Sequence, residues 1–301
     1  MSEQKKVPNA AKFAIGGSAG MLATCFVQPL DLIKNRMQTA VVKEYKSSGD
    51  AFVGILRKEG FFALYNGLSA GLMRQATYTT TRLGIYTWLF EAMTKDGTPP
   101  GFATKAGIGL IAGVVGSFVG VPAEVSLIRM TSDGRLPPSE RRNYKHVIDA
   151  MYRIYKEEGI ATMWKGAFAT MGRAVVVNVA QLTTYSQVKQ YFSKHIDEGI
   201  GLHFISAMIS GLVTTIASMP VDIIKTRLQN MKTINGKPEY SGAGDVVGRI
   251  LKNEGFFALW KGFTPYYFRI GPHTVLTFIF LEQLTGAYYK YVLKSEKGAS
   301  M

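Results

Sequence analysis

The chain has 301 residues, a formal net charge of +14 and a pI near 9.7, a balance that suits nucleic acid, anionic lipid or an anionic substrate. Its single cysteine, Cys25, excludes an internal disulfide framework and a cysteine-based zinc site, and we interpret it as a packing residue in an apolar run. Residues 1–11 match neither a signal peptide nor a cleaved transit peptide, so we expect any targeting information to be internal.

Two motifs recur three times in the same order. The first, a proline with an acid two residues later, occupies residues 29–36, 122–129 and 220–227. The second runs from a Glu-Gly pair to a glycine, at residues 59–67, 158–166 and 254–262. A period of roughly a hundred residues suits one helical hairpin per repeat. We therefore predict one domain, residues 1–301, built from repeats at residues 12–98, 99–197 and 198–292.

Each repeat is predicted to hold two membrane-spanning helices and one short surface helix. In the first repeat, residues 13–30 carry no charge and are long enough to cross a hydrocarbon core of about 30 Å. Pro29 predicts a kink, after which the helix continues to about Thr39. An amphipathic helix is expected at residues 48–58 on the membrane surface, and a second spanning helix at residues 69–93.

The same order is predicted twice more. Spanning helices are expected at residues 102–130, 168–194, 202–230 and 265–291, with surface helices near residues 144–156 and 242–252. The matching kinks are expected at Pro122 and Pro220. Six spans place both termini on one side of the membrane. Basic residues gather in the segments that join the paired helices, which places the surface helices on the matrix or cytoplasmic side.

Three arginines stand at equivalent positions in the spanning helices. Seven residues beyond the glycine that ends each second motif are Arg74, Arg173 and Arg269. A charge at this depth is costly unless it is paired, so we expect an anion, and a dicarboxylate offers a carboxylate to each of two guanidinium groups. Eight residues further the repeats differ, with Arg82, Gln181 and Thr277, and Tyr78 shares the face of Arg74 and Arg82. These unequal positions are expected to read the substrate. The alternative is that the arginines reach lipid head groups or brace helix ends.

No catalytic or metal site is predicted. The four histidines, His146, His195, His203 and His273, do not have the spacing of metal ligands. The sequence also has no nucleophile-base pair, phosphate loop or metal cluster. A packing role is favoured for His273. A nucleic-acid-binding protein, which the basic charge also allows, is disfavoured by the lack of a nucleic-acid-binding motif. It is also disfavoured by three runs without Asp, Glu, Lys or Arg, at residues 13–30, 106–123 and 199–221.

The two motifs together resemble the signature of the mitochondrial carrier family over nearly the whole chain. Longer strings at residues 28–38, 74–84, 173–178 and 266–272 favour, within this family, an antiporter that exchanges 2-oxoglutarate for malate or a related dicarboxylate. The resemblance implies an all-α membrane protein with six transmembrane helices in a pseudo-threefold barrel and three short surface helices on the matrix side. It also implies the mitochondrial inner membrane, termini toward the intermembrane space, no cofactor and no obligate protein partner. Another anion carrier of this fold, for dicarboxylate-phosphate exchange or proton leak, is the alternative.

The resemblance further implies a gate at each end of the barrel. On the matrix side, Glu124 is expected to pair with Lys225 and Asp222 with Lys34, whereas the position that faces Asp31 holds Leu127. The recurring arginines of the motif are expected to neutralise helix C-terminal carbonyls; they are Arg36, Arg129 and Arg227. A plain kink with surface charges is the alternative for this motif. At the opposite end, aromatic packing is expected to close the barrel around Tyr86, Tyr185, Lys189 and Phe280.

The second motif is expected, from the same resemblance, to bind cardiolipin through backbone amides and lysine side chains. The residues implied are Gly67, Trp164, Lys165, Gly166, Trp260, Lys261 and Gly262. Asn66 breaks the pattern in the first repeat. The alternative is an ordinary helix start with an aromatic residue at the membrane interface.

Overall fold

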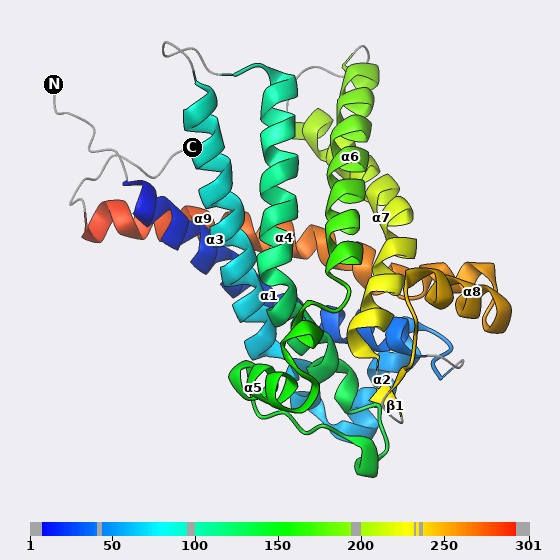
Figure 1. Cartoon of the computed structure of the whole chain (residues 1–301). Coiled ribbons are helices and arrows are strands. Elements are labelled where there is room, and N and C mark those ends of the chain that lie inside the picture. The colour runs from blue at the N-terminus through cyan, green and yellow to red at the C-terminus, as the bar shows by residue number, and fades with distance from the viewer. Residues whose placement is uncertain are drawn as a thin grey trace, which may run out of the picture.

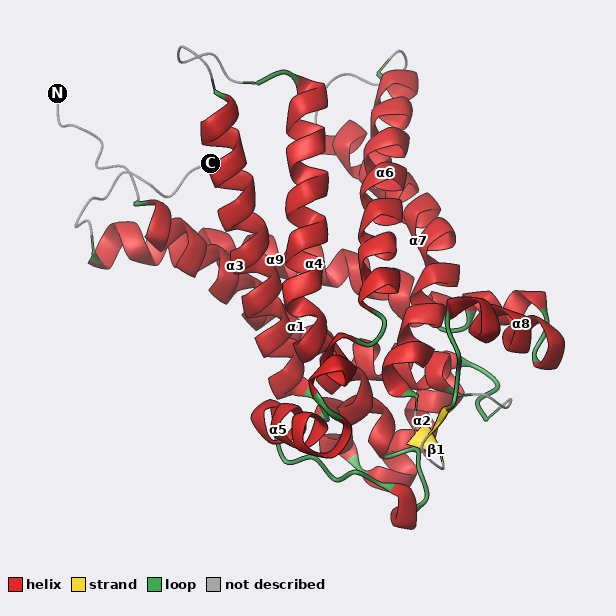
Figure 2. Cartoon of the chain, in the orientation of Figure 1, coloured by secondary structure: helices red, strands yellow, loops and turns green. Residues whose placement is uncertain are grey.

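The computed structural model describes residues 8–40, 44–94, 100–193, 200–231, 233–234 and 237–292, and helices dominate it (Figure 1, Figure 2). The long helices are α1 (Asn9–Thr39), α3 (Leu68–Met93), α4 (Phe102–Asp133), α6 (Ala167–Phe192), α7 (Ile200–Asn230) and α9 (Phe263–Tyr291). The short helices are α2 (Ser48–Glu59), α5 (Val147–Glu158) and α8 (Ala243–Asn253). The predicted all-helical class is confirmed.

Every predicted helix is present, and its ends lie within a few residues of the expected ones. The structure adds 3-10 helices at Phe61–Tyr65, Pro138–Glu140, Ile160–Trp164 and Phe256–Trp260, and an antiparallel pair of two-residue strands, β1 (Thr233–Ile234) and β2 (Lys237–Pro238). These elements are too short for hydrophobic periodicity to reveal. Residues 1–7, which bear on the targeting expectation, the predicted helix end at Lys194, and His195 lie outside the described residues.

The long helices form a closed ring. Neighbours pack in the order α1, α3, α4, α6, α7, α9 and back to α1. In Figure 1, α3, α4 and α6 run side by side, and α5 lies across the lower end of the ring. The start of α1 and the end of α9 lie on the same side of the view (Figure 1), as an even number of spans requires.

Each short helix is anchored on the long helix that precedes it. Shared buried apolar clusters contain Ile55 of α2 with Leu32 of α1, Ile154 of α5 with Val125 of α4, and Ile250 of α8 with Ile223 of α7. Burying apolar surface on one face explains the amphipathic pattern of these helices. The packing also holds the charged residues of the two motifs close together.

Glycines set the start of the second long helix in each repeat. Gly67, Gly166 and Gly262 have φ of +82°, +76° and +84°, which L side chains rarely adopt. Space is short as well, because a Cβ on Gly67 would lie 3.2 Å from Leu127 Cδ1. Since α3, α6 and α9 start at equivalent points, the arginines seven residues later stand at equivalent heights in their helices.

Membrane-spanning character differs between alternate helices. Within the part of the chain that the structure describes, three helices are long and apolar enough to cross a membrane, over Phe13–Thr39, Ala103–Asp133 and Ile205–Asn230. In α1, α4 and α7 the charged residues of the first motif follow a long uncharged stretch, whereas α3, α6 and α9 carry Arg74, Arg173 and Arg269 within the span. This alternation fits a ring with a polar interior. The prolines of the first motif lie inside α1, α4 and α7, which continue past them, so their kinks stay a prediction.

Candidate functional site

At the end of the ring that carries the motifs, three arginine–glutamate pairs occupy equivalent positions in the three repeats. The pairs are Arg36–Glu59, Arg129–Glu158 and Arg227–Glu254. The Nε groups of these arginines also donate to backbone carbonyls of the next repeat, at Thr131 (2.9 Å), Gln229 (3.2 Å) and Gln38 (3.2 Å). These carbonyls lie in the last turns of α4, α7 and α1. The arginines therefore bind helix C-terminal carbonyls as predicted, but those of the neighbouring repeat.

Two glutamates of these pairs, Glu158 and Glu254, have a pKa below the ordinary value. Burial raises the pKa of Glu254, but hydrogen bonds from Arg227 and Lys261 more than offset it, so the pKa lies below its ordinary value. Burial also raises the pKa of Glu158, but the hydrogen bond from Arg129 and the positive charges of Arg129 and Lys165 together lower it below its ordinary value. The sequence motif contained these glutamates, but their partners were visible only in the structure.

Further into the ring, the acids and lysines of the first motif meet. Lys225 Nζ lies 2.9 Å from Glu124 Oε1, and Lys34 forms an ion pair with Asp222, whose side chain is fully buried. Both expected pairs are therefore present, and each joins two different repeats. Lys225 Nζ also lies 3.5 Å from Asp222 Oδ1. These contacts hold the ring together at this end.

Two glutamines that sequence reasoning missed support the same acids. Gln38 Nε2 donates to Asp222 Oδ2 at 3.0 Å, and Gln229 Nε2 donates to Glu124 Oε2 at 3.4 Å. Both glutamines stand nine residues after the proline of their motif, so the repeat itself held the signal. The equivalent residue of the second repeat is Thr131.

The third acid, Asp31, has a partner that the motif did not predict. Leu127 packs in an apolar cluster with Ala70 and Met130. Asp31 Oδ1 instead lies 2.9 Å from the Nε of Arg269 on α9. One of the arginines predicted to bind substrate therefore occupies the place opposite Asp31.

The three equivalent arginines have unequal surroundings. Arg173 Nε lies 2.6 Å from Asp222 Oδ1, and its Nη2 donates to the Tyr266 hydroxyl at 2.8 Å. Tyr266 was also missed from the sequence, and its ring lies 4.6 Å from Lys34 Nζ. Within the described residues, Arg74 has no carboxylate at ion-pair distance, and its buried Nε has no hydrogen-bond partner. A buried donor of this kind calls for an anion or ordered water.

Charge in this region does not balance. Five cations face three carboxylates inside the ring, which leaves an excess of two positive charges. The cations are Lys34, Arg74, Arg173, Lys225 and Arg269, and the carboxylates are those of Asp31, Glu124 and Asp222. Uncompensated charge is costly away from bulk water, so the region favours a doubly charged anion. Among the described residues, no cluster of three His, Cys, Asp or Glu side chains could hold a metal ion.

The other predicted substrate residues lie further along α3 and α6. The Arg82 guanidinium lies 3.4 Å from the Tyr78 hydroxyl. Both residues pack at Gly116 of α4, where a Cβ would lie 3.2 Å from Arg82 Cβ. Gln181 is exposed, and its backbone oxygen accepts a hydrogen bond from Ser210 at 2.9 Å. The structure thus brings Tyr78 and Arg82 together, whereas Gln181 stands apart on α6.

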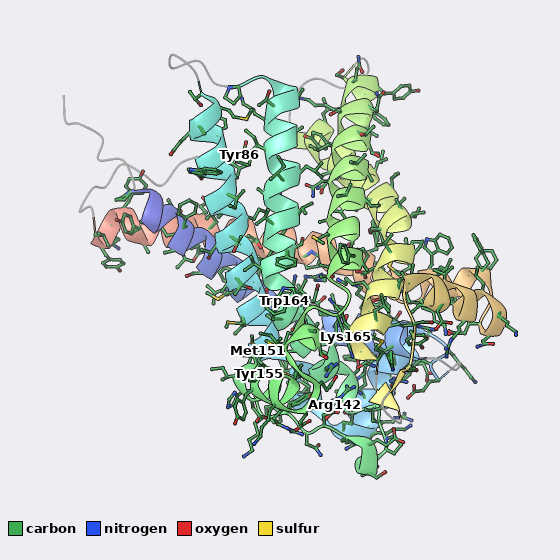
Figure 3. The ribbon with its side chains drawn as sticks, viewed as in Figure 1. Tyr86, Arg142, Met151, Tyr155, Trp164 and Lys165 are labelled. Atoms are coloured by element: carbon green, nitrogen blue, oxygen red, sulfur yellow. The ribbon has the colours of Figure 1, made fainter. Side chains whose placement is uncertain are left out.

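Residues predicted for the opposite gate take part in separate contacts. Tyr86 stacks on Phe90 of its own helix with ring centres 6.0 Å apart, and Phe280 packs on Phe26 of α1 at 5.8 Å. Figure 3 places Tyr86 on the upper part of α3, far from the end that carries the motifs. Closure of this end by these rings, with Tyr185 and Lys189, stays a prediction.

The predicted lipid-binding residues surround the starts of the second long helices. Gly67, Gly166 and Gly262 begin their helices without a side-chain cap, which leaves backbone N–H groups available. A cavity of about 530 Å³ borders Trp164, Gly166 and Gly242. Trp164 and Lys165 lie at the lower end of the ring in Figure 3. The lysines face glutamates, since Lys261 pairs with Glu254 and Lys165 Nζ lies 3.9 Å from Glu158 Oε2.

Comparison with known proteins agrees with this arrangement. The model of the family described as "Mitochondrial carrier protein" matches the chain three times, at residues 5–97, 98–196 and 197–292. The chain is 62% identical over 301 residues to the mitochondrial 2-oxoglutarate/malate carrier protein of Caenorhabditis elegans, with 98% of each chain covered. It is 62% identical to the Bos taurus protein of that name, over 95% of this chain and 93% of the other. It is 39% identical to mitochondrial uncoupling protein 5 of Arabidopsis thaliana, over 93% and 98%. Because the family model matches in three consecutive copies over almost the full length, this chain belongs to the mitochondrial carrier family.

Proposed function

We propose that this protein is an antiporter that exchanges 2-oxoglutarate for malate or a related dicarboxylate across the mitochondrial inner membrane. The observation that carries the proposal is the excess of two positive charges inside the ring, where no carboxylate of the described residues lies at ion-pair distance from Arg74. A dicarboxylate neutralises this excess, whereas a neutral ligand leaves it uncompensated. The 62% identity to two carriers named for these substrates supports the same choice.

Substrate binding is assigned to the arginine layer. Arg74, Arg173 and Arg269 bind the two carboxylates, because planar guanidinium groups match carboxylates with two parallel hydrogen bonds. Tyr78, Arg82 and Gln181 then read the rest of the substrate. The observed contact of Arg82 with Tyr78 supports a shared role for these two side chains.

Alternating access requires a gate at each end. We assign the matrix gate to the inter-repeat ion pairs, formed by Asp31, Lys34, Glu124, Asp222 and Lys225. Buried pairs suit a gate, because desolvation offsets much of their attraction and substrate can then tip the balance. The opposite gate is assigned to Tyr86, Tyr185, Lys189 and Phe280.

Lipid binding and orientation complete the proposal. Cardiolipin phosphates are expected at the helix starts, because uncapped N–H groups and the helix dipole attract anions. The cavity beside Trp164 and Gly166 supports a site there. The termini are placed toward the intermembrane space, since basic residues gather at the opposite end of the ring. The protein is expected to transport without a partner protein.

A competition assay tests the substrate class. Proteoliposomes that contain the purified protein and malate would take up labelled 2-oxoglutarate in the presence of unlabelled competitors with one, two or three carboxylates, or of phosphate. Dicarboxylates are expected to compete most strongly. Equal or stronger competition by phosphate or by a monocarboxylate would contradict the proposal.

A further inference from the structure

Equivalent positions show what the matrix gate lacks in the second repeat. Lys34 and Leu127 occupy the same step of the first motif. A Cβ on Gly262 would lie 3.5 Å from Lys34 Cγ, and a Cβ on Gly67 would lie 3.2 Å from Leu127 Cδ1. The two side chains therefore start from equivalent places in the ring. A lysine in place of Leu127 would extend toward Asp31.

The second repeat also lacks the supporting glutamine. Asp222 receives both an ion pair from Lys34 and a hydrogen bond from Gln38. The residue equivalent to Gln38 is Thr131, and its hydroxyl donates to the backbone of its own helix at 2.8 Å. Asp31 therefore receives neither of the two contacts that hold Asp222.

Arg269 is the substitute for both contacts. Its Nε lies 2.9 Å from Asp31 Oδ1, and this is the one ion pair of Asp31 in the part of the chain that the structure describes. The Asp31 side chain is 8% exposed and that of Arg269 is 17% exposed. By contrast, Asp222 would keep Lys34 if Arg173 moved away. Only Asp31 depends on an arginine of the substrate layer.

We propose that Arg269 is shared between gate and substrate, so that Asp31 competes with the substrate carboxylate for one guanidinium group. The inference rests on the proposed function and specifies how that site acts on the gate. When a carboxylate of the substrate takes Arg269, Asp31 becomes a buried charge without a partner, which is strongly unfavourable. Substrate binding and weakening of the matrix gate are then one event, located between α9 of the third repeat and α1 of the first repeat.

Two substitutions remove the competition in different ways. Asp31→Asn removes the negative charge, and Leu127→Lys gives Asp31 another partner. Both are expected to lower the half-saturating concentration of 2-oxoglutarate by at least about fivefold, the lower end of the usual range for coupled sites. Leu127→Lys should also slow maximal exchange, because Asp31 then keeps a partner when substrate binds. The substrate-dependent rise in unfolding temperature in detergent should occur at lower 2-oxoglutarate concentration in both variants.

Glu124→Gln is the matched control, because it breaks a gate pair that contains no arginine. It is expected to change the maximal rate without lowering the half-saturating concentration. If wild type exchanges 2-oxoglutarate for malate while both test variants show an unchanged or higher half-saturating concentration, the shared role of Arg269 is wrong and the proposed function stands. If wild type shows no such exchange, the proposed function fails and this inference with it. If Asp31→Asn does not fold, Leu127→Lys decides, because it retains Asp31.

Discussion

Removing Lys225 should leave Glu124 without an ion-pair partner, whereas Asp222 should keep one. Glu124 would lose its ion pair and keep only weak hydrogen bonds from Thr170 at 3.3 Å and Gln229 at 3.4 Å. Asp222 would keep Lys34, because Lys225 contributes only a 3.5 Å contact there. Stranding a buried charge costs about 3 to 5 kcal/mol, and two neutral hydrogen bonds recover about 1 kcal/mol each. The matrix-closed state of Lys225→Ala should therefore be destabilised by about 1 to 3 kcal/mol.

This magnitude predicts a large and non-additive effect on exchange. If the matrix-closed state is well populated in wild type, its population in Lys225→Ala falls about 5- to 150-fold, and exchange falls with it. Adding Glu124→Ala should restore much of the rate, since no unpaired acid remains. Glu124→Ala alone should be milder, because Lys225 can still contact Asp222. A double-mutant cycle tests this: initial exchange rates in proteoliposomes are measured for wild type, both single variants and the double variant. Strictly additive losses would show that the two residues do not interact.

Three further predictions follow from named contacts. Replacing Arg74, Arg173 or Arg269 singly by alanine should abolish exchange in proteoliposomes without unfolding the protein. Lysine should restore little exchange, because it lacks the planar guanidinium group that binds a carboxylate through two hydrogen bonds. Near wild-type rates in all three alanine variants would show that these arginines do not form the substrate site. Gly134→Ala should lower the unfolding temperature in detergent, because the added Cβ forces apart Arg36 and Glu59 at a cost of about 1 to 3 kcal/mol. Gly54→Ala is the control, because its Cβ would meet no atom within 4 Å. Equal effects of the two substitutions would contradict the close packing of Gly134 against Arg36 and Glu59. The pKa of Glu254 is lower in the folded than in the unfolded protein, so its contribution to folding stability is present above the unfolded pKa and is lost as pH falls through the folded pKa. The unfolding temperature of Glu254→Gln should therefore decline less than that of wild type between about pH 6 and pH 3. Parallel curves of unfolding temperature against pH would refute this prediction.

Much of the fold could be predicted because the sequence repeats its own boundaries. Proline, glycine and charge recur at fixed steps, so an end that was ambiguous in one repeat was fixed by the others. The same counting found Arg74, Arg173 and Arg269. The pairing of Lys34 with Asp222 and of Lys225 with Glu124 came instead from the resemblance to the carrier family. Gln38 and Gln229 also recur at a fixed step of the repeat and could have been found. A neutral amide, however, does not require a buried partner as strongly as a charge does, so its position alone does not predict an ion-pair contact.

Other contacts left no trace in the repeat. Tyr266 stands where the other repeats have Gly71 and Thr170, so comparison of the three copies gives no sign of its contact with Arg173. The pairing of Arg269 with Asp31 joins an arginine of the substrate layer to an acid of the first motif, and its reach depends on how α9 packs against α1. Side-chain reach across the ring is set by tertiary packing, which periodicity does not encode.

Uptake of labelled 2-oxoglutarate into proteoliposomes tests the central claim most directly. Vesicles loaded with malate would be compared with empty vesicles and with vesicles that contain the Arg173→Ala variant. The proposed exchange predicts rapid uptake only with wild-type protein and internal malate, because an inward-moving dianion must be replaced by an outward-moving one. Equal uptake into empty and malate-loaded vesicles, or none into either, would contradict dicarboxylate antiport.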